Sequence, residues 1–121
     1  MANTKESMDR LMEIEGSIGC CLADSNSGMV LGQAGGGPAF NLEVAAAGNT
    51  EVVRSKRKTM KALNLQDGIE DILITLGRQY HLIRLLSSND ALFLYLVLDK
   101  TKSNLAMARH QLAQVEKELS V

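Results

Sequence analysis

Three short apolar runs follow one another between residues 69 and 99, and this segment constrains the fold more than any other part of the chain. The runs are rich in Val, Ile, Leu, Phe and Tyr, whereas the breaks at 77–79 and 87–90 contain Gly, Ser, Asn and Asp. Apolar β-formers interrupted by turn formers are typical of consecutive strands. Because each break is too short for a parallel crossover, we predict that neighbouring strands pair antiparallel.

The last of these runs is apolar on both of its alternating faces. One face carries Leu92, Leu94, Leu96 and Leu98, and the other carries Ala91, Phe93, Tyr95 and Val97. A strand with two apolar faces is buried from both sides, so other elements must cover the sheet above and below. The rest of the chain has to supply those elements.

The remaining sequence contains helical and hairpin patterns that suit this purpose. The expected helices span 4–15, 38–63 and 103–119, and a hairpin joins strands at 18–23 and 29–33. Apolar residues recur with helical spacing in each helix, and Pro38 suits the first turn of the long one. We therefore predict one domain over 1–121, an α/β (α+β) sandwich of order α-β-β-α-β-β-β-α. Its five-stranded antiparallel sheet carries the long helix on one face and the N- and C-terminal helices on the other.

Composition narrows the classes of function. Net charge is −1 and aromatic residues make up 3%, so neither an overall basic charge nor a set of stacking rings favours nucleic acid. No apolar run is long enough to span a membrane, and the polar N-terminus lacks the apolar core of a signal peptide. We expect a cytoplasmic protein that binds neither nucleic acid nor membrane.

No pattern in the chain predicts catalysis. Cys20 and Cys21 are adjacent on a strand and point to opposite faces, and neither His81 nor His110 has a partner at metal-ligand spacing. The glycine-rich stretch 35–37 lacks the Lys-Ser/Thr pair of a phosphate-binding loop. We expect no enzyme activity, no metal and no cofactor. An alternative is a ligand-sensing module with a small pocket between helix and sheet, for which Arg84 is the one polar candidate.

The long helix carries an apolar stripe with two polar residues inside it. The stripe consists of Leu42, Ala45, Ala46, Val52, Val53, Met60 and Leu63. Asn49 and Lys56 fall in its middle, where they could fix the register of a helix–helix interface between two copies. In the other interpretation the stripe packs on its own sheet and both polar groups reach its rim.

Three stretches resemble the roadblock/dynein light-chain family of the longin-like superfold. They are the Ile14–Gly19 entry to the first strand with its Ser27-Gly28 hairpin, the glycines before the long helix, and the strand-to-helix passage 91–112. The resemblance implies a homodimer, with long helices side by side and third strands joined edge to edge. It also implies a non-catalytic platform for a small Ras-like GTPase or a signalling or motility assembly. Some bacterial gliding regulators of this family stimulate GTP hydrolysis without supplying a catalytic arginine.

These considerations lead to two predicted surfaces. An apolar edge strand at 69–76 with little charge to protect it invites pairing with a second copy. The predicted dimer interface comprises Val52, Val53, Lys56, Met60, Ile72 and Ile74. The strongest charge feature is the basic second half of the long helix, which is either a solvated helix surface or a docking surface for an acidic partner. The predicted partner contacts are Arg54, Arg57, Lys58 and Lys61.

Overall fold

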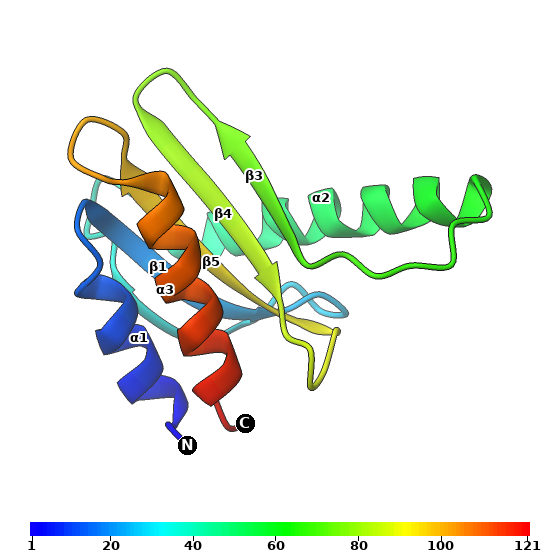
Figure 1. Ribbon diagram of the computed structural model, residues 1–121, viewed down its shortest axis with the longest axis horizontal. Helices are drawn as coiled ribbons and strands as arrows, with labels where there is room; N and C mark the ends of the chain where they lie inside the picture. Colours follow the sequence, from blue (N-terminus) through cyan, green and yellow to red (C-terminus); the bar gives the residue numbers. More distant parts are fainter.

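The computed structural model, which describes residues 1–121, contains a five-stranded antiparallel sheet and three helices (Figure 1). The elements are α1 (Thr4–Met12), β1 (Ser17–Asp24), β2 (Val30–Gly35), α2 (Leu42–Ala62), β3 (Asp71–Thr75), β4 (Gln79–Leu85), β5 (Leu92–Asp99) and α3 (Leu105–Glu118). The strands lie in the order β2-β1-β5-β4-β3. This confirms the predicted sandwich and its order of elements.

The doubly apolar strand β5 lies at the centre of the sheet, between β1 and β4. Every residue from Leu92 to Leu98 is buried. A central strand covered on both faces needs apolar residues at all positions, which is the pattern that the sequence contains.

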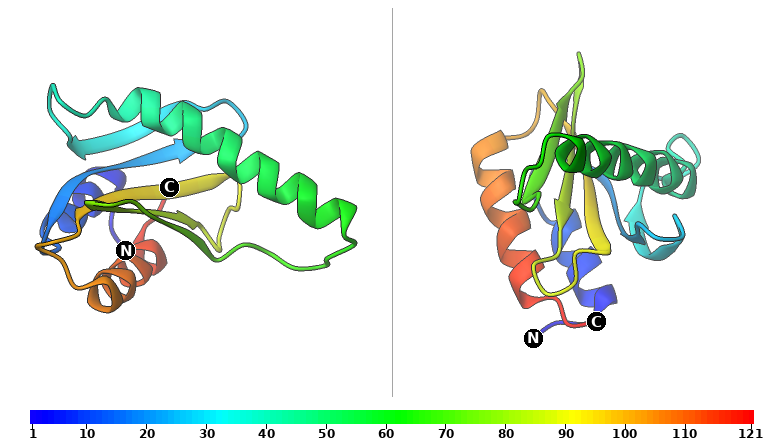
Figure 2. Two further views of the ribbon diagram at one scale, coloured as in Figure 1. Left: turned by 90° about the horizontal axis from the view of Figure 1, so that it is seen from above. Right: turned by 90° about the vertical axis from the view of Figure 1, so that its right-hand side faces the viewer.

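Each face of the sheet has its own apolar core. Helices α1 and α3 cover one face, where Leu94 and Leu96 pack with Leu11 and Leu112 (Figure 2). Helix α2 crosses the opposite face, and its Val53 packs in a second core that includes Phe93.

The helices begin and end differently from the prediction because local caps override periodicity. Helix α2 starts at Leu42 rather than Pro38, since the side chain of Asn41 accepts hydrogen bonds from the backbone N–H groups of Glu43 and Val44. The glycines 35–37 before it all have positive φ, which is incompatible with a right-handed helix. Helix α1 ends at Met12, short of the predicted residue 15.

The second half of α2 projects beyond the β3 edge of the sheet (Figures 1 and 2). The buried residues of the helix are Leu42, Ala46, Thr50 and Val53, all in its first two thirds. The following connection, residues 63–68, is exposed throughout. We refer below to residues 56–65 as the projecting end of α2.

Candidate interface

The α2 side of the sheet is incompletely covered. Helix α2 packs mainly against β1, and a shallow, open depression of about 420 Å³ lies along its flank. The depression is lined largely by apolar atoms and includes Phe40, Val44, Ala45, His81 and Tyr95. Val44 is 67% exposed at its rim. An apolar sheet face with one open flank can accept further packing.

Strand β3 is a free edge beside this depression. Two backbone bonds show which residues of β3 bond to β4. They run from Leu76 N–H to Gln79 O (2.8 Å) and from Leu85 N–H to Glu70 O (3.2 Å). Because bonded and non-bonded pairs alternate in an antiparallel ladder, the N–H and C=O groups of Asp71, Leu73 and Thr75 face away from the sheet. The edge therefore offers a row of unpaired backbone groups.

The predicted dimer residues divide into surface and core. Ile72 and Ile74 are half-buried on the open face of β3, Val52 is half-buried on α2, and Met60 is half-buried on the projecting end. Lys56 is exposed, and helical spacing puts it on the α2 flank that carries Asn49.

Val53 corrects the prediction, since it is 0% exposed. It packs beneath α2 against the chain's own sheet and has no surface left for a partner. The apolar stripe of α2 therefore has two sides. One side, with Leu42, Ala46 and Val53, packs on the chain's own sheet. The other side, with Asn49 and Lys56, borders the open flank.

The two arginines of the basic cluster are already engaged within the chain. Arg54 donates from Nε to the carbonyl of Ser25 (3.0 Å) and from Nη2 to that of Asn26 (2.6 Å). Arg57 donates to the carbonyl of Asp90 and, at 3.4 Å, to the Ser25 hydroxyl. Both guanidinium groups therefore hold α2 against two loops, a role within the chain that the sequence did not predict.

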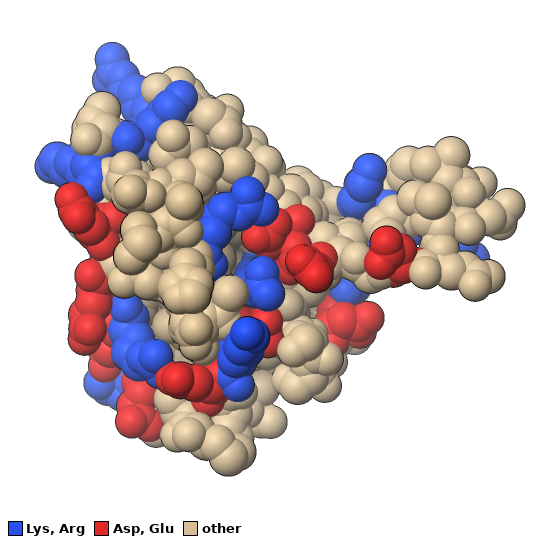
Figure 3. Space-filling model, in the orientation of Figure 1, with Lys and Arg blue, Asp and Glu red and all other residues tan.

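Lys58 and Lys61 remain free for a partner. Both are exposed, and neither side chain takes part in a hydrogen bond or salt bridge. Figure 3 shows basic side chains on the projecting end of α2. The same segment contains the exposed apolar residues Leu63 and Leu65. Together these residues give the end of α2 a mixed basic and apolar surface of the kind that protein partners bind.

A polar cluster lies at the centre of the open face. His81 Nε2 is 2.8 Å from Gln79 Oε1, and its Nδ1 is 2.8 Å from the Tyr95 hydroxyl. Burial lowers the pKa of His81 and raises that of Tyr95 to about 12. The edge of the imidazole also meets the Phe40 ring at 5.9 Å between centroids. Sequence spacing gave no indication of this cluster, because its members come from β4, β5 and the approach to α2.

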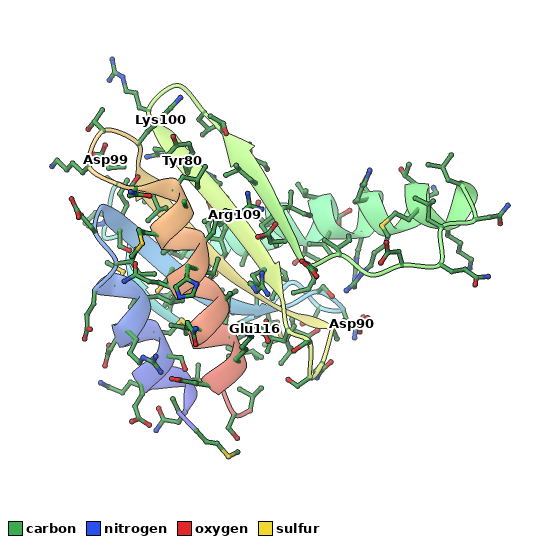
Figure 4. All side chains as sticks on the ribbon, in the orientation of Figure 1. Tyr80, Asp90, Asp99, Lys100, Arg109 and Glu116 are labelled. Carbon is green, nitrogen blue, oxygen red and sulfur yellow. The ribbon has the colours of Figure 1, made fainter.

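A second polar network connects α3 to the β3 edge. Glu116 accepts from Arg84 Nε (3.2 Å) and from the Ser87 hydroxyl (3.0 Å), and Asp71 accepts from Arg109 Nη2 at 2.6 Å. Figure 4 shows Arg109 and Glu116 on α3 alongside β4. Arg84, the one candidate for a ligand-sensing pocket, is thus paired with Glu116 and, at 3.7 Å, with Asp71. Its charge is therefore compensated within the chain.

The side chains that could act as nucleophiles or metal ligands are buried or lie far from one another. Burial raises the pKa of both Cys20 and Cys21 to about 12, so neither is a thiolate at neutral pH. No three His, Cys, Asp or Glu side chains are grouped to hold a metal ion. None of the helices combines the length and the apolar character that crossing a membrane requires.

Comparison with solved structures identifies the fold. Myxococcus xanthus MglB superimposes with a TM-score of 0.82 at 16% identity, over 93% of this chain and 81% of that chain. A Roadblock/LC7 domain from Streptomyces avermitilis gives 0.80 at 13% identity, over 96% and 93%. An MglB in a tetrameric arrangement gives 0.74 at 18% identity, over 95% and 88%. These likenesses confirm the predicted roadblock fold. No family model and no curated protein matches the sequence.

Proposed function

We propose that this roadblock-fold chain forms a homodimer that binds and regulates a small Ras-like GTPase. The observation that carries the proposal is the coincidence of three features on one side of the molecule. These are the free β3 edge, the open sheet face beside it, and the end of α2 that projects past the same edge. Each of them leaves apolar surface or backbone polar groups unpaired in a single copy.

A two-fold arrangement satisfies all three features together. If two β3 strands pair, the sheet continues into the second copy, and each projecting α2 end reaches the open face of its partner. Lys56 and Met60 would then come from one copy, and Ile72 and Ile74 from the other. Such an interface is self-complementary, as a dimer with two-fold symmetry requires.

The structural likenesses support self-association and the class of partner. One of the similar MglB proteins adopts a tetrameric arrangement. The resemblance to roadblock proteins found in the sequence points to a GTPase as partner, and the exposed Lys58 and Lys61 supply charge that an acidic surface would attract.

The dimer is tested by Ile74→Lys. We expect the wild type to have the mass of a dimer in light scattering and the variant to be a folded monomer, because an ammonium group on the open face of β3 resists burial. Leu31→Lys is the matched control: Leu31 is 49% exposed on β2, the opposite edge strand, and its replacement should leave the dimer intact. A wild-type monomer, or equal dissociation of both variants, would contradict the proposed interface.

Partner binding is tested by reversing charge at Lys58 and Lys61 together. We expect the double glutamate variant to lose about tenfold in affinity for a Ras-like GTPase, since each exposed charge pair contributes about 0.2–1 kcal/mol. The measurement is titration calorimetry with the GTPase loaded with GDP or a GTP analogue. The control reverses the charge of Lys5 and Lys102, which lie on α1 and after β5 and change net charge equally. Equal affinity of both double variants for the GTPase would contradict the proposal that the projecting end of α2 is the docking surface.

A further inference from the structure

We propose that His81 makes the dimer sensitive to pH, so that copies associate in neutral solution and separate on mild acidification. The inference rests on the proposed dimer, and it assigns a regulatory role to the polar cluster at the centre of the open face. The chain has two histidines, and only His81 belongs to that face.

The polar contacts of His81 are satisfied in its neutral form. Because the amide Oε1 of Gln79 can only accept, Nε2–H donates to it at 2.8 Å, and in the neutral ring Nδ1 then accepts from the Tyr95 hydroxyl at 2.8 Å. A proton added at Nδ1 would make the Tyr95 hydroxyl accept instead and would place a positive charge beside the Phe40 and Tyr95 rings. The neutral ring therefore fits the cluster better than the imidazolium does.

No carboxylate in the cluster compensates that charge. The elements packed around His81 are β3, β5 and the region at the start of α2, which contribute Ile74, Val97, Tyr95 and Phe40.

The nearest charged groups lie outside the cluster. Asp99 is paired with Gln79 rather than His81, and its carboxylate accepts from the backbone and hydroxyl of Thr101. Glu70 precedes β3 and is exposed, and Lys56 on the α2 flank is itself positive. Cys21, which shares this face of the sheet, is a neutral thiol.

The direction of the pH effect follows from linkage. Burial already lowers the pKa of His81 in a single copy, and a second copy placed over the open face removes more water from the ring. The pKa in the dimer is then lower than in the monomer, so the monomer binds more protons. Dimer affinity is complete above the monomer pKa and is lost as the pH falls below it. With two His81 side chains per dimer, the loss approaches about 100-fold per pH unit, about tenfold for each.

The experiment measures the dimer dissociation constant by sedimentation equilibrium at about pH 8 and at about one pH unit below the pKa of His81 in the monomer, which an NMR titration of the diluted wild type gives first. We compare the wild type with His81→Gln, which cannot titrate but keeps a polar amide, and with His110→Gln, which removes the exposed histidine of α3. We expect the dissociation constant of the wild type and of His110→Gln to rise about tenfold or more on acidification. That of His81→Gln should stay constant. Circular dichroism at both pH values verifies that each chain is folded.

The outcomes separate this inference from the proposed dimer. A wild type that is monomeric at about pH 8 would contradict both the proposed dimer and the proposed role of His81. A dimer whose affinity is independent of pH, or a His81→Gln dimer that still dissociates in acid, removes the role of His81 and leaves the dimer standing. If His81→Gln does not dimerise at all, an NMR titration of the His81 ring decides. Its pKa in the wild type must be lower at a concentration where the chain is dimeric than at a dilution where it is monomeric, and equal values overturn the inference.

Discussion

Replacing Phe93 by Ala is expected to lower the free energy of unfolding by about 3–5 kcal/mol. Phe93 lies on the central strand β5 and is 0% exposed in the core beneath α2. Its removal leaves a cavity between the sheet and the helix, and this core is what holds α2 in the position from which its end projects. Since small domains have about 5–15 kcal/mol in total, the loss is a large fraction of their stability.

Urea unfolding measured by circular dichroism tests this expectation. Phe93→Leu, which refills much of the volume, should lose less than the alanine variant and gives a value even if the latter does not fold. Met107→Ala is the control, because Met107 is 54% exposed on α3, away from the proposed dimer interface, and its truncation should change stability by less than about 0.5 kcal/mol. Similar losses for Phe93→Ala and Met107→Ala would contradict the described core.

Replacing Glu116 by Ala is the second change with a large expected effect, about 3 kcal/mol of stability. Glu116 is 5% exposed, and its carboxylate accepts from Arg84 and Ser87. Without it, a mostly buried guanidinium retains only Asp71, at 3.7 Å. A mostly buried charge left with one partner at 3.7 Å is more costly than a missing surface ion pair.

The matched control breaks a surface ion pair on the same helix. Glu118 pairs with Arg10, and both side chains are more than one third exposed. Glu118→Ala should therefore cost less than about 1 kcal/mol in the same urea measurement. Equal losses of stability in the two alanine variants would contradict the expectation that the buried contacts of Glu116 stabilise the fold more than the surface ion pair of Glu118 does.

The fold could be predicted because its strongest patterns are local. The two apolar faces of β5 required a central, doubly covered strand, and the short breaks around it required antiparallel neighbours. The ends of α2 were less predictable. Pro38 is compatible with a first helical turn, but the cap at Asn41 and the positive φ of Gly37 start the helix four residues later.

The candidate site could be predicted only in part, because side-chain roles depend on tertiary contacts. Helical spacing showed that Arg54 and Arg57 belong to a basic stretch, but not that the carbonyls of Ser25 and Asp90 lie within reach of them. In the same way, periodicity cannot tell which side of an apolar stripe meets the chain's own sheet, and Val53 lies on that side. The cluster around His81 joins residues far apart in sequence and had no local signal.

Amide hydrogen exchange along the two edge strands tests the proposed dimer most directly. In a single copy, the N–H groups of Leu73 and Thr75 on β3 face away from the sheet. The N–H groups of Gln33 and Gly35 on β2 also face outward, because the bond from Gly36 N–H to Ile18 O shows which residues of β2 bond to β1. We expect Leu73 and Thr75 to be protected in the wild type and to exchange rapidly in Ile74→Lys, while Gln33 and Gly35 exchange rapidly in both. Rapid exchange of Leu73 and Thr75 in the wild type would contradict pairing through β3.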